Sequence, residues 1–265
     1  MRRPLSLSLL LFVLVSPNGA AAAGDAPTIG AVHGNLLDSL ARLRAATGGL
    51  PPATRTAVAR LEVSAGAVVA EIETRLAGQF ERRPDRLDAT ERQLVADAVV
   101  LAERIEAATA SLASLSGADA RQLVGDADIL AYDAVHALPC HAQRPRLVYV
   151  TPEELALNGK PAEVRIRGNY LAFGAEPEIR VEGQPALLLA RGANELHLRL
   201  PQALFRNLEA PRPVTVRFRP TAMARTCYLW GLLPWSSLVA AEQELTATVV
   251  LRPGDGESTR ERAGL

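Results

Sequence analysis

The apolar residues of this chain change their spacing once, between His136 and Pro152. Before this joint they recur every three or four residues among many Ala and Arg, and after it they alternate with polar residues in short runs. The first spacing places apolar side chains along one face of a helix, and alternation places them on one face of a strand. The sequence therefore predicts an α+β protein, with a helical bundle over 24–138, a linker over 139–145 and an antiparallel β region over 146–253.

The beginning of the chain has the pattern of a secretory signal peptide. Arg2 and Arg3 precede an apolar run over 5–15, and a cluster of small residues ends at Ala23. A charged start, a short apolar run and an A-x-A site are what export requires, and the run is well short of the roughly 20 residues of a membrane-spanning helix. We expect residues 1–23 to be removed and the mature chain to be periplasmic or secreted, with no membrane span.

Charge is balanced, with 29 Lys and Arg against 29 Asp and Glu. Loss of Arg2 and Arg3 with the signal peptide leaves a slight acidic excess. Binding to nucleic acid or to an anionic membrane surface needs a concentration of positive charge that this composition lacks. We therefore expect no nucleic-acid partner.

Four helices are predicted in the first region, because four apolar stripes are separated by Gly and Pro breaks. The stripes cover 36–43, 58–76, 94–115 and 123–138. Asp88, with Glu91 three residues later, forms a capping-box pattern at the start of the third helix. Short links favour antiparallel neighbours, as an up-and-down bundle or as two helical hairpins. The stripes alone do not distinguish a self-contained bundle from a coiled coil that binds a partner.

The joint holds a group of residues with metal-binding or catalytic chemistry: Asp133, His136, Cys140 and His141. Imidazole and thiolate are ligands that zinc prefers, so a metal-dependent enzyme using these residues is one alternative. Their spacing matches no common zinc pattern, and Pro139 interrupts the helix between them. Sequence neighbours such as Cys140 and His141 also seldom present a nucleophile and a base to each other. We predict no metal, no other cofactor and no catalytic residues.

Cys140 and Cys227 are the two cysteines of the chain. In an exported protein, two cysteines most simply form a disulfide. A bond across this long loop stabilises the folded state by about 4–5 kcal/mol in the chain-entropy model. We predict a Cys140–Cys227 disulfide that ties the end of the helical region to a late part of the β region, with two buried free thiols as the alternative.

Seven short runs with period two predict strands in the second region. They cover 147–150, 164–167, 179–181, 186–190, 196–200, 214–218 and 245–251. Short strands bounded by Gly, Pro and Asn, with one polar face, are typical of an antiparallel β-sandwich.

Within this region, residues 145–201 resemble an IPT/TIG domain. An opening strand ends in Pro152, Asn158-Gly159 precedes Val164-x-Ile166-x-Gly168-Asn169, then Ile179-x-Val181-x-Gly183 and Leu198-x-Leu200-Pro201 follow. The resemblance implies an immunoglobulin-like fold and a role in binding, dimerisation or spacing, without shared catalytic residues. The chain departs from the family pattern after Phe218, where a longer segment with Cys227 replaces a simple closing strand.

Both tryptophans lie in one short segment near Pro and Gly, together with Tyr228. Such side chains offer a large contact area at low entropic cost, so Tyr228, Trp230 and Trp235 are the predicted partner-binding residues, on a flat loop surface. The alternatives are that these rings fill the contact between the two regions, or that Trp230 and Trp235 bind carbohydrate. The polar tail over 254–265 is expected to be disordered.

Taken together, these features predict an exported, non-catalytic binding or scaffolding protein of the cell envelope or extracellular space. The expected partner is a protein. The alternatives are a carbohydrate-binding accessory module and the metal-dependent enzyme described above.

Overall fold

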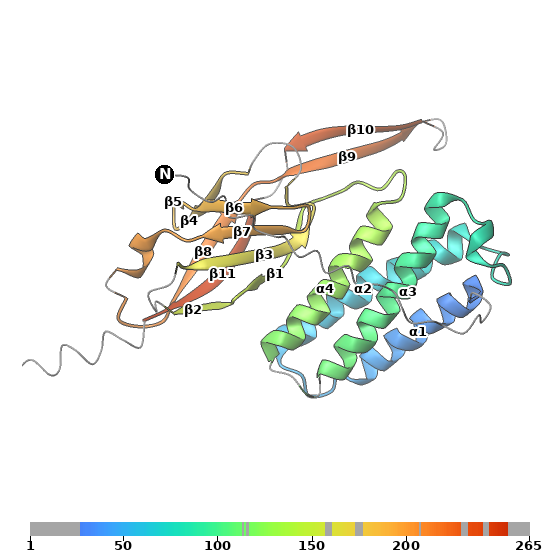
Figure 1. Cartoon of the computed structure of the whole chain (residues 1–265), viewed down its shortest axis with the longest axis horizontal. Helices are drawn as coiled ribbons and strands as arrows, with labels where there is room; N and C mark the ends of the chain where they lie inside the picture. Colours follow the sequence, from blue (N-terminus) through green and yellow to red (C-terminus); the bar gives the residue numbers. More distant parts are fainter. Residues whose placement is uncertain are drawn as a thin grey trace, which may run out of the picture.

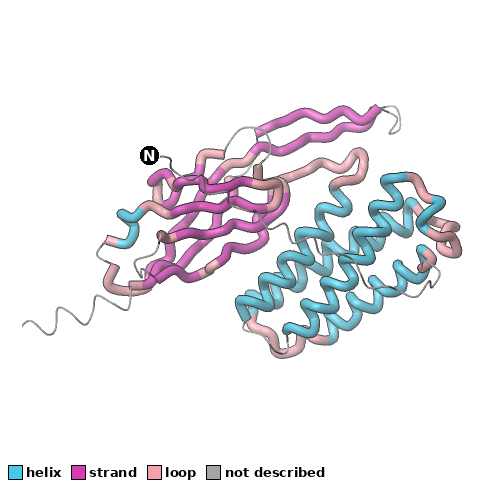
Figure 2. Tube along the Cα trace, in the orientation of Figure 1, coloured by secondary structure: helices cyan, strands magenta, loops and turns pink. Residues whose placement is uncertain are grey.

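The computed structural model describes residues 27–112, 114, 117–156, 161–172, 177–206, 208–228, 233–240 and 244–253. The predicted signal peptide, Trp230 and the tail over 254–265 lie outside these residues. The described chain has helices in its first half and mostly antiparallel sheets in its second (Figure 1 and Figure 2). This confirms the α+β class.

Four helices form the first half, as predicted. They are α1 (Ile29–Ala45), α2 (Pro52–Arg75), α3 (Ala89–Leu112) and α4 (Gly117–His136), with a short 3-10 turn η1 (Pro84–Arg86) before α3. The capping box is confirmed, because the Glu91 amide donates to Asp88 Oδ1 at 2.8 Å and the Asp88 amide donates to Glu91 Oε2 at 3.4 Å. None of the described helices combines the length and the apolar character needed to cross a membrane.

The helices pack side by side in the order α1-α3-α4-α2. α1 and α2 run antiparallel, because the ion pairs His33–Glu73 and Arg44–Glu62 advance along α1 as they recede along α2. α1 packs mainly on α3, and α4 packs on α2 and α3, whereas the consecutive pairs α1 and α2, and α2 and α3, touch much less. Apolar side chains of all four helices form one core.

The described residues of the second half form eleven strands: β1 (Arg146–Thr151), β2 (Glu154–Ala156), β3 (Glu163–Asn169), β4 (Ile179–Val181), β5 (Gln184–Pro185), β6 (Leu187–Arg191), β7 (Glu195–Arg199), β8 (Arg212–Phe218), β9 (Thr221–Tyr228), β10 (Leu233–Ala240) and β11 (Leu245–Arg252). All seven predicted runs are strands. One sheet has the order β1-β3-β7-β6 and the other the order β2-β11-β8-β4-β5, with β2 alone pairing in parallel. Apolar residues of both sheets share one core.

β9 and β10 form a separate two-stranded ribbon between β8 and β11. Their antiparallel register is unbroken, from Leu233 opposite Tyr228 to Ala240 opposite Thr221. The prediction of a loop around Trp235 is therefore wrong, since Trp235 lies in β10. The ribbon was missed because its Ala, Ser and Pro residues have weak strand propensity. Figure 1 shows it extending beyond both sheets, over the end of α4.

Candidate functional site

The two halves meet where α4 faces β1 and β3, and Arg146 lies at the centre of this contact. Its guanidinium lies 3.2 Å from Asp128 Oδ2 and donates to Ser64 Oγ at 3.2 Å and to Asn169 Oδ1 at 3.0 Å. The same group lies 4.1 Å from the centroid of the Tyr132 ring. Asp128 is 1% exposed and accepts a hydrogen bond from Ser64 at 2.6 Å. One arginine from the first strand thus compensates a carboxylate buried in the bundle.

A second carboxylate of α4, Asp133, binds two asparagines of the β half. Its Oδ1 accepts from Asn169 Nδ2 at 2.9 Å and its Oδ2 accepts from Asn194 Nδ2 at 2.6 Å. Asn169 also donates to the Ile129 carbonyl of α4 at 2.8 Å. Burial raises the pKa of the neighbouring Tyr170, and Asp133 adds to that shift. The phenol therefore stays protonated beside this carboxylate.

A third carboxylate of α4, Asp126, lies at the outer part of the contact. The Tyr149 hydroxyl donates to Asp126 Oδ1 at 2.8 Å, and Arg167 Nη2 donates to the same oxygen at 3.1 Å. Burial and the hydrogen bond to Asp126 raise the pKa of Tyr149 to about 12. Arg167 also donates to Glu195 at 3.0 Å. These polar groups bind one another across the two halves, so their chemistry is that of a structural contact.

Two of the residues proposed for metal binding or catalysis lie together, because the rings of His136 and His141 meet edge to face with their centroids 5.9 Å apart. Asp133, however, accepts hydrogen bonds from Asn169 and Asn194. His136 donates to the Tyr132 carbonyl at 2.9 Å and stacks on the Tyr132 ring. Burial lowers the pKa of His136, and His141 Nε2 lies 3.3 Å from Glu71 Oε1. Within the described ranges, no group of three or more His, Cys, Asp or Glu residues could hold a metal ion.

Cys140 lies beside the ribbon in a left-handed backbone conformation, with φ 73°. The Cys227 side chain lies outside the described residues, so the Cys140–Cys227 disulfide stays a prediction. The backbone is compatible with it. Gln143 and Met223 exchange two backbone hydrogen bonds of 3.0 Å in an antiparallel bridge. Because the two segments run in opposite directions, Cys140, three residues before Gln143, lies toward the part of β9 that follows Met223.

α4 lies close against β1 at Gly125. A Cβ added to Gly125 would lie 2.5 Å from Cδ1 of Tyr149, whose ring is fixed by its hydrogen bond to Asp126. We expect Gly125→Ala to lower the free energy of unfolding by about 1–3 kcal/mol through this overpacking, despite the gain of about 1 kcal/mol in helix propensity. Urea unfolding followed by circular dichroism measures the difference.

Gly34→Ala is the matched control, because a Cβ on this glycine of α1 would meet nothing within 4 Å. It should raise the free energy of unfolding by up to about 1 kcal/mol. Equal stabilisation by Gly125→Ala would contradict the close packing of α4 on Tyr149.

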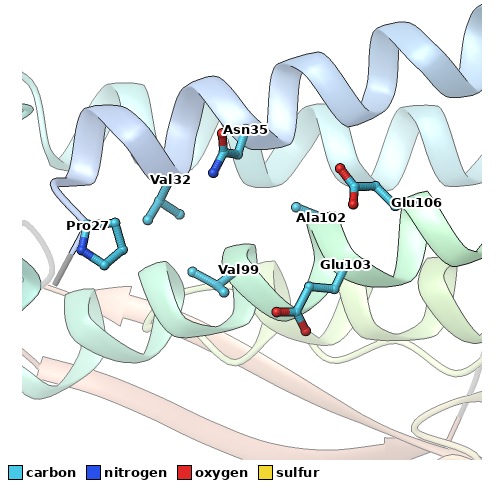
Figure 3. Close-up of a pocket in the computed structure, with 7 residues that line it drawn as sticks. All are labelled: Pro27, Val32, Asn35, Val99, Ala102, Glu103 and Glu106. Carbon is cyan, nitrogen blue, oxygen red and sulfur yellow. The ribbon is translucent and has the colours of Figure 1, made fainter. Parts of the chain in front are cut away.

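A shallow pocket of about 250 Å³ lies between α1 and α3 (Figure 3). Its lining residues are Pro27, Val32, Asn35, Val99, Ala102, Glu103 and Glu106. Glu106 is already bound by Arg42 and Ser39. Ligand pockets are typically about 300–1,000 Å³ and bury most of their ligand, so this pocket supports no function for small molecules.

Among the side chains that the structure describes, Trp235 of the ribbon is the most exposed aromatic one. Trp235 is 66% exposed, and Leu238 and Val239 in the same strand are 53% and 43% exposed. The alternative that the tryptophans fill the contact between the halves is therefore wrong for Trp235. The Tyr228 side chain and Trp230 lie outside the described residues, so their assignment stays a prediction.

Leu238 and Val239 were not singled out from the sequence. The run over 233–240 carries apolar residues on both of its alternating phases, so it has no polar face to mark the solvent side. An apolar strand without a polar face reads as buried. One signal in the sequence marks this segment: it lies between the predicted strands at 214–218 and 245–251, which pair with each other without it.

Comparisons with known proteins add little to this geometry. No family model matches the chain, and no curated protein matches it. A solved structure described as the Bacillus anthracis TIE protein is similar at 12% identity and a TM-score of 0.22 over 71% of this chain. The match spans 38% of the length of that protein. A likeness at this level carries no argument about fold or function.

Proposed function

We propose that this protein is an exported, non-catalytic binding or scaffolding protein of the cell envelope or extracellular space, and that its partner is a protein. In this proposal the β half is an immunoglobulin-like sandwich of the IPT/TIG type. Two supports are the common core of the two sheets and the resemblance of residues 145–201 to that family. Domains of that family act by binding and spacing.

The observation that carries the proposal is the exposed apolar surface of β10, made by Trp235 and Val239 on one face of the ribbon and by Leu238 on the other. Single exposed apolar residues are common on monomers, but a group of them in one short strand that stands apart from both sheets indicates an interaction site. Tryptophan is also enriched among the few residues that dominate protein interfaces. We call these three side chains the ribbon patch.

The contact between the halves supports the same proposal, because it holds the ribbon in place. Met223 of β9 is bridged to Gln143, and Arg225 Nη1 lies 3.4 Å from the carbonyls of Ala137 and Leu138 at the end of α4. A surface fixed before binding loses less conformational entropy when the partner arrives. The bundle thus acts as the support and the ribbon as the contact.

Affinity capture with matched variants tests this function. The mature chain, Trp235→Ala and Leu187→Ala serve as baits against the envelope and secreted fractions of the source cells. Leu187 is the control, because this β6 residue is 56% exposed and lies outside the ribbon. We expect a discrete protein to be retained by the mature chain and by Leu187→Ala, with retention reduced at least about tenfold by Trp235→Ala, as for an interface hot spot. Equal retention by all three baits would contradict the proposal.

A carbohydrate partner is the second candidate, because the exposed Trp235 ring offers a flat stacking surface. The neighbouring Leu238 and Val239 are aliphatic and supply none of the polar groups that orient a small ligand. We therefore expect titration with soluble polysaccharides to leave the tryptophan fluorescence unchanged. A saturable shift that disappears in Trp235→Ala would assign the ribbon patch to carbohydrate binding.

A further inference from the structure

We propose that two copies of this chain pair through the free edge of β10, by antiparallel strand addition centred on Ser237. This inference goes beyond partner binding, and it rests on the proposed function only in treating the ribbon as a contact surface. It would join the two ribbons into one four-stranded sheet, with β10 of each copy at its centre.

The edge of β10 is open and unprotected. Among the described residues β10 pairs with β9 alone, and every position from Trp235 to Val239 is exposed. β10 carries no charged residue, and Pro234 lies near the tip end of the strand. Exposed edges of natural sheets are usually protected by charged side chains, proline or a covering segment. From Trp235 onward β10 has no charged residue and no proline, and no segment that the structure describes pairs with its outer edge. Two uncharged edges do not repel each other.

The opposite edge of the ribbon explains why pairing would stop at two copies. Met223 of β9 already exchanges two backbone hydrogen bonds of 3.0 Å with Gln143 of its own chain. Among the described residues, the outer edge of β9 is therefore bridged at Met223, whereas β10 has no bridge on its outer edge. Pairing of identical edges around a two-fold axis gives a closed dimer.

The register follows from the side chains. Alternation places Trp235, Ser237 and Val239 on one face of the ribbon. A two-fold axis normal to a sheet pairs one residue with its own copy, and the choice of Ser237 sets Trp235 opposite Val239 of the second copy. Aromatic residues opposite β-branched residues are favourable cross-strand pairs. The small Ser237 side chains meet at the axis without a clash.

The size of the contact sets the expected strength. An edge formed by one eight-residue strand is small beside the roughly 1,200 Å² that a stable specific interface buries. We therefore expect a weak dimer whose population rises with concentration. Strand addition leaves the faces of the sheet open, so the paired ribbons would still present Trp235 to a protein partner.

Cysteine crosslinking tests the register in the mature chain. Ser237→Cys places two thiols directly opposite each other, within the range of a disulfide. Ser236→Cys is the matched control. In this register Ser236 lies opposite Leu238 of the second copy, so the two thiols introduced at this position do not face each other. Under mild oxidation, non-reducing gels should show covalent dimer forming at least about tenfold faster for Ser237→Cys. Equal rates for the two variants would overturn the proposed register.

A second pair of variants tests the edge without added thiols. Val239→Lys places a charge on the edge strand, as natural edges do, and Leu187→Lys places one on another exposed strand. Sedimentation velocity should show concentration-dependent dimer for the mature chain and Leu187→Lys, and monomer for Val239→Lys. A mature chain that stays monomeric at every soluble concentration overturns the pairing, even if Trp235→Ala still abolishes partner capture. Dimer formation without any captured protein supports the pairing and counts against the proposed function.

Discussion

Replacing Arg146 with Ala should lower the free energy of unfolding by about 3–5 kcal/mol, because it leaves a buried carboxylate without its compensating charge. Asp128 is almost fully buried, and Arg146 is the arginine that reaches it. The substitution also removes hydrogen bonds to Ser64 and Asn169, so it weakens the bundle and the contact between the halves together. Urea unfolding of the protein, followed by far-ultraviolet circular dichroism, measures the loss.

Two further variants separate this effect from a general loss of charge. Arg180→Ala breaks the exposed ion pair with Glu178 and should change the stability by no more than about 1 kcal/mol. The double variant Asp128→Leu with Arg146→Met replaces the pair by apolar side chains and should recover most of the lost stability. An Arg146→Ala variant as stable as Arg180→Ala would contradict the role given to Arg146.

Replacing Gly168 with Ala should destabilise the protein by at least about 2 kcal/mol, at the upper end of overpacking effects. A Cβ at this position would lie 2.0 Å from the Arg146 carbonyl oxygen and 3.1 Å from Leu147 Cα. Both atoms belong to the backbone of β1, so relief requires β1 and β3 to move apart. That movement would also displace the Arg146 side chain from Asp128. Thermal unfolding of the variant measures the effect.

Gly192→Ala is the control for this prediction. A Cβ on Gly192 would come no closer than 3.8 Å to Glu195 O, which is an ordinary contact. Its effect should stay within about 0.5 kcal/mol, as for most surface substitutions. Since Gly168 and Arg146 act on the same contact, the double variant Gly168→Ala with Arg146→Ala should lose less than the sum of the two single losses. Additive losses would contradict the shared contact.

The sequence was most informative where structure depends on local patterns. The spacing of Leu94, Val95 and Leu101 predicts α3, and the pair Asp88 and Glu91 predicts its start. Alternation predicts strands such as β3 and β8 for the same reason. In each case a few neighbouring residues determine which face is buried.

The contact between the halves was not predictable in this way. Asp128, Arg146 and Asn169 are polar residues that look like surface positions, and only the packing of α4 on β1 and β3 brings them together. One local signal was present, because Gly125 interrupts a helix of good helix formers. A glycine inside a helix often marks a close approach of another segment, and here that segment carries Tyr149.

The candidate binding surface was predicted in part. Trp235 was selected for its amphipathic ring and is exposed, but it lies on a strand instead of the expected loop. Leu238 and Val239 became candidates only when the ribbon was seen to stand apart from the sheets (Figure 1). Whether an apolar strand is buried depends on which segments pair with it, and those partners are distant in the sequence.

The central claim is that the ribbon patch binds a protein, and site-specific photocrosslinking in intact cells tests it most directly. A benzoylphenylalanine in place of Trp235 is compared with one in place of Leu187, which is similarly exposed on another strand. The expected result is a discrete, light-dependent adduct from position 235 alone, with its attached protein identified by mass spectrometry. No adduct from position 235, or the same adducts from both positions, would contradict the claim.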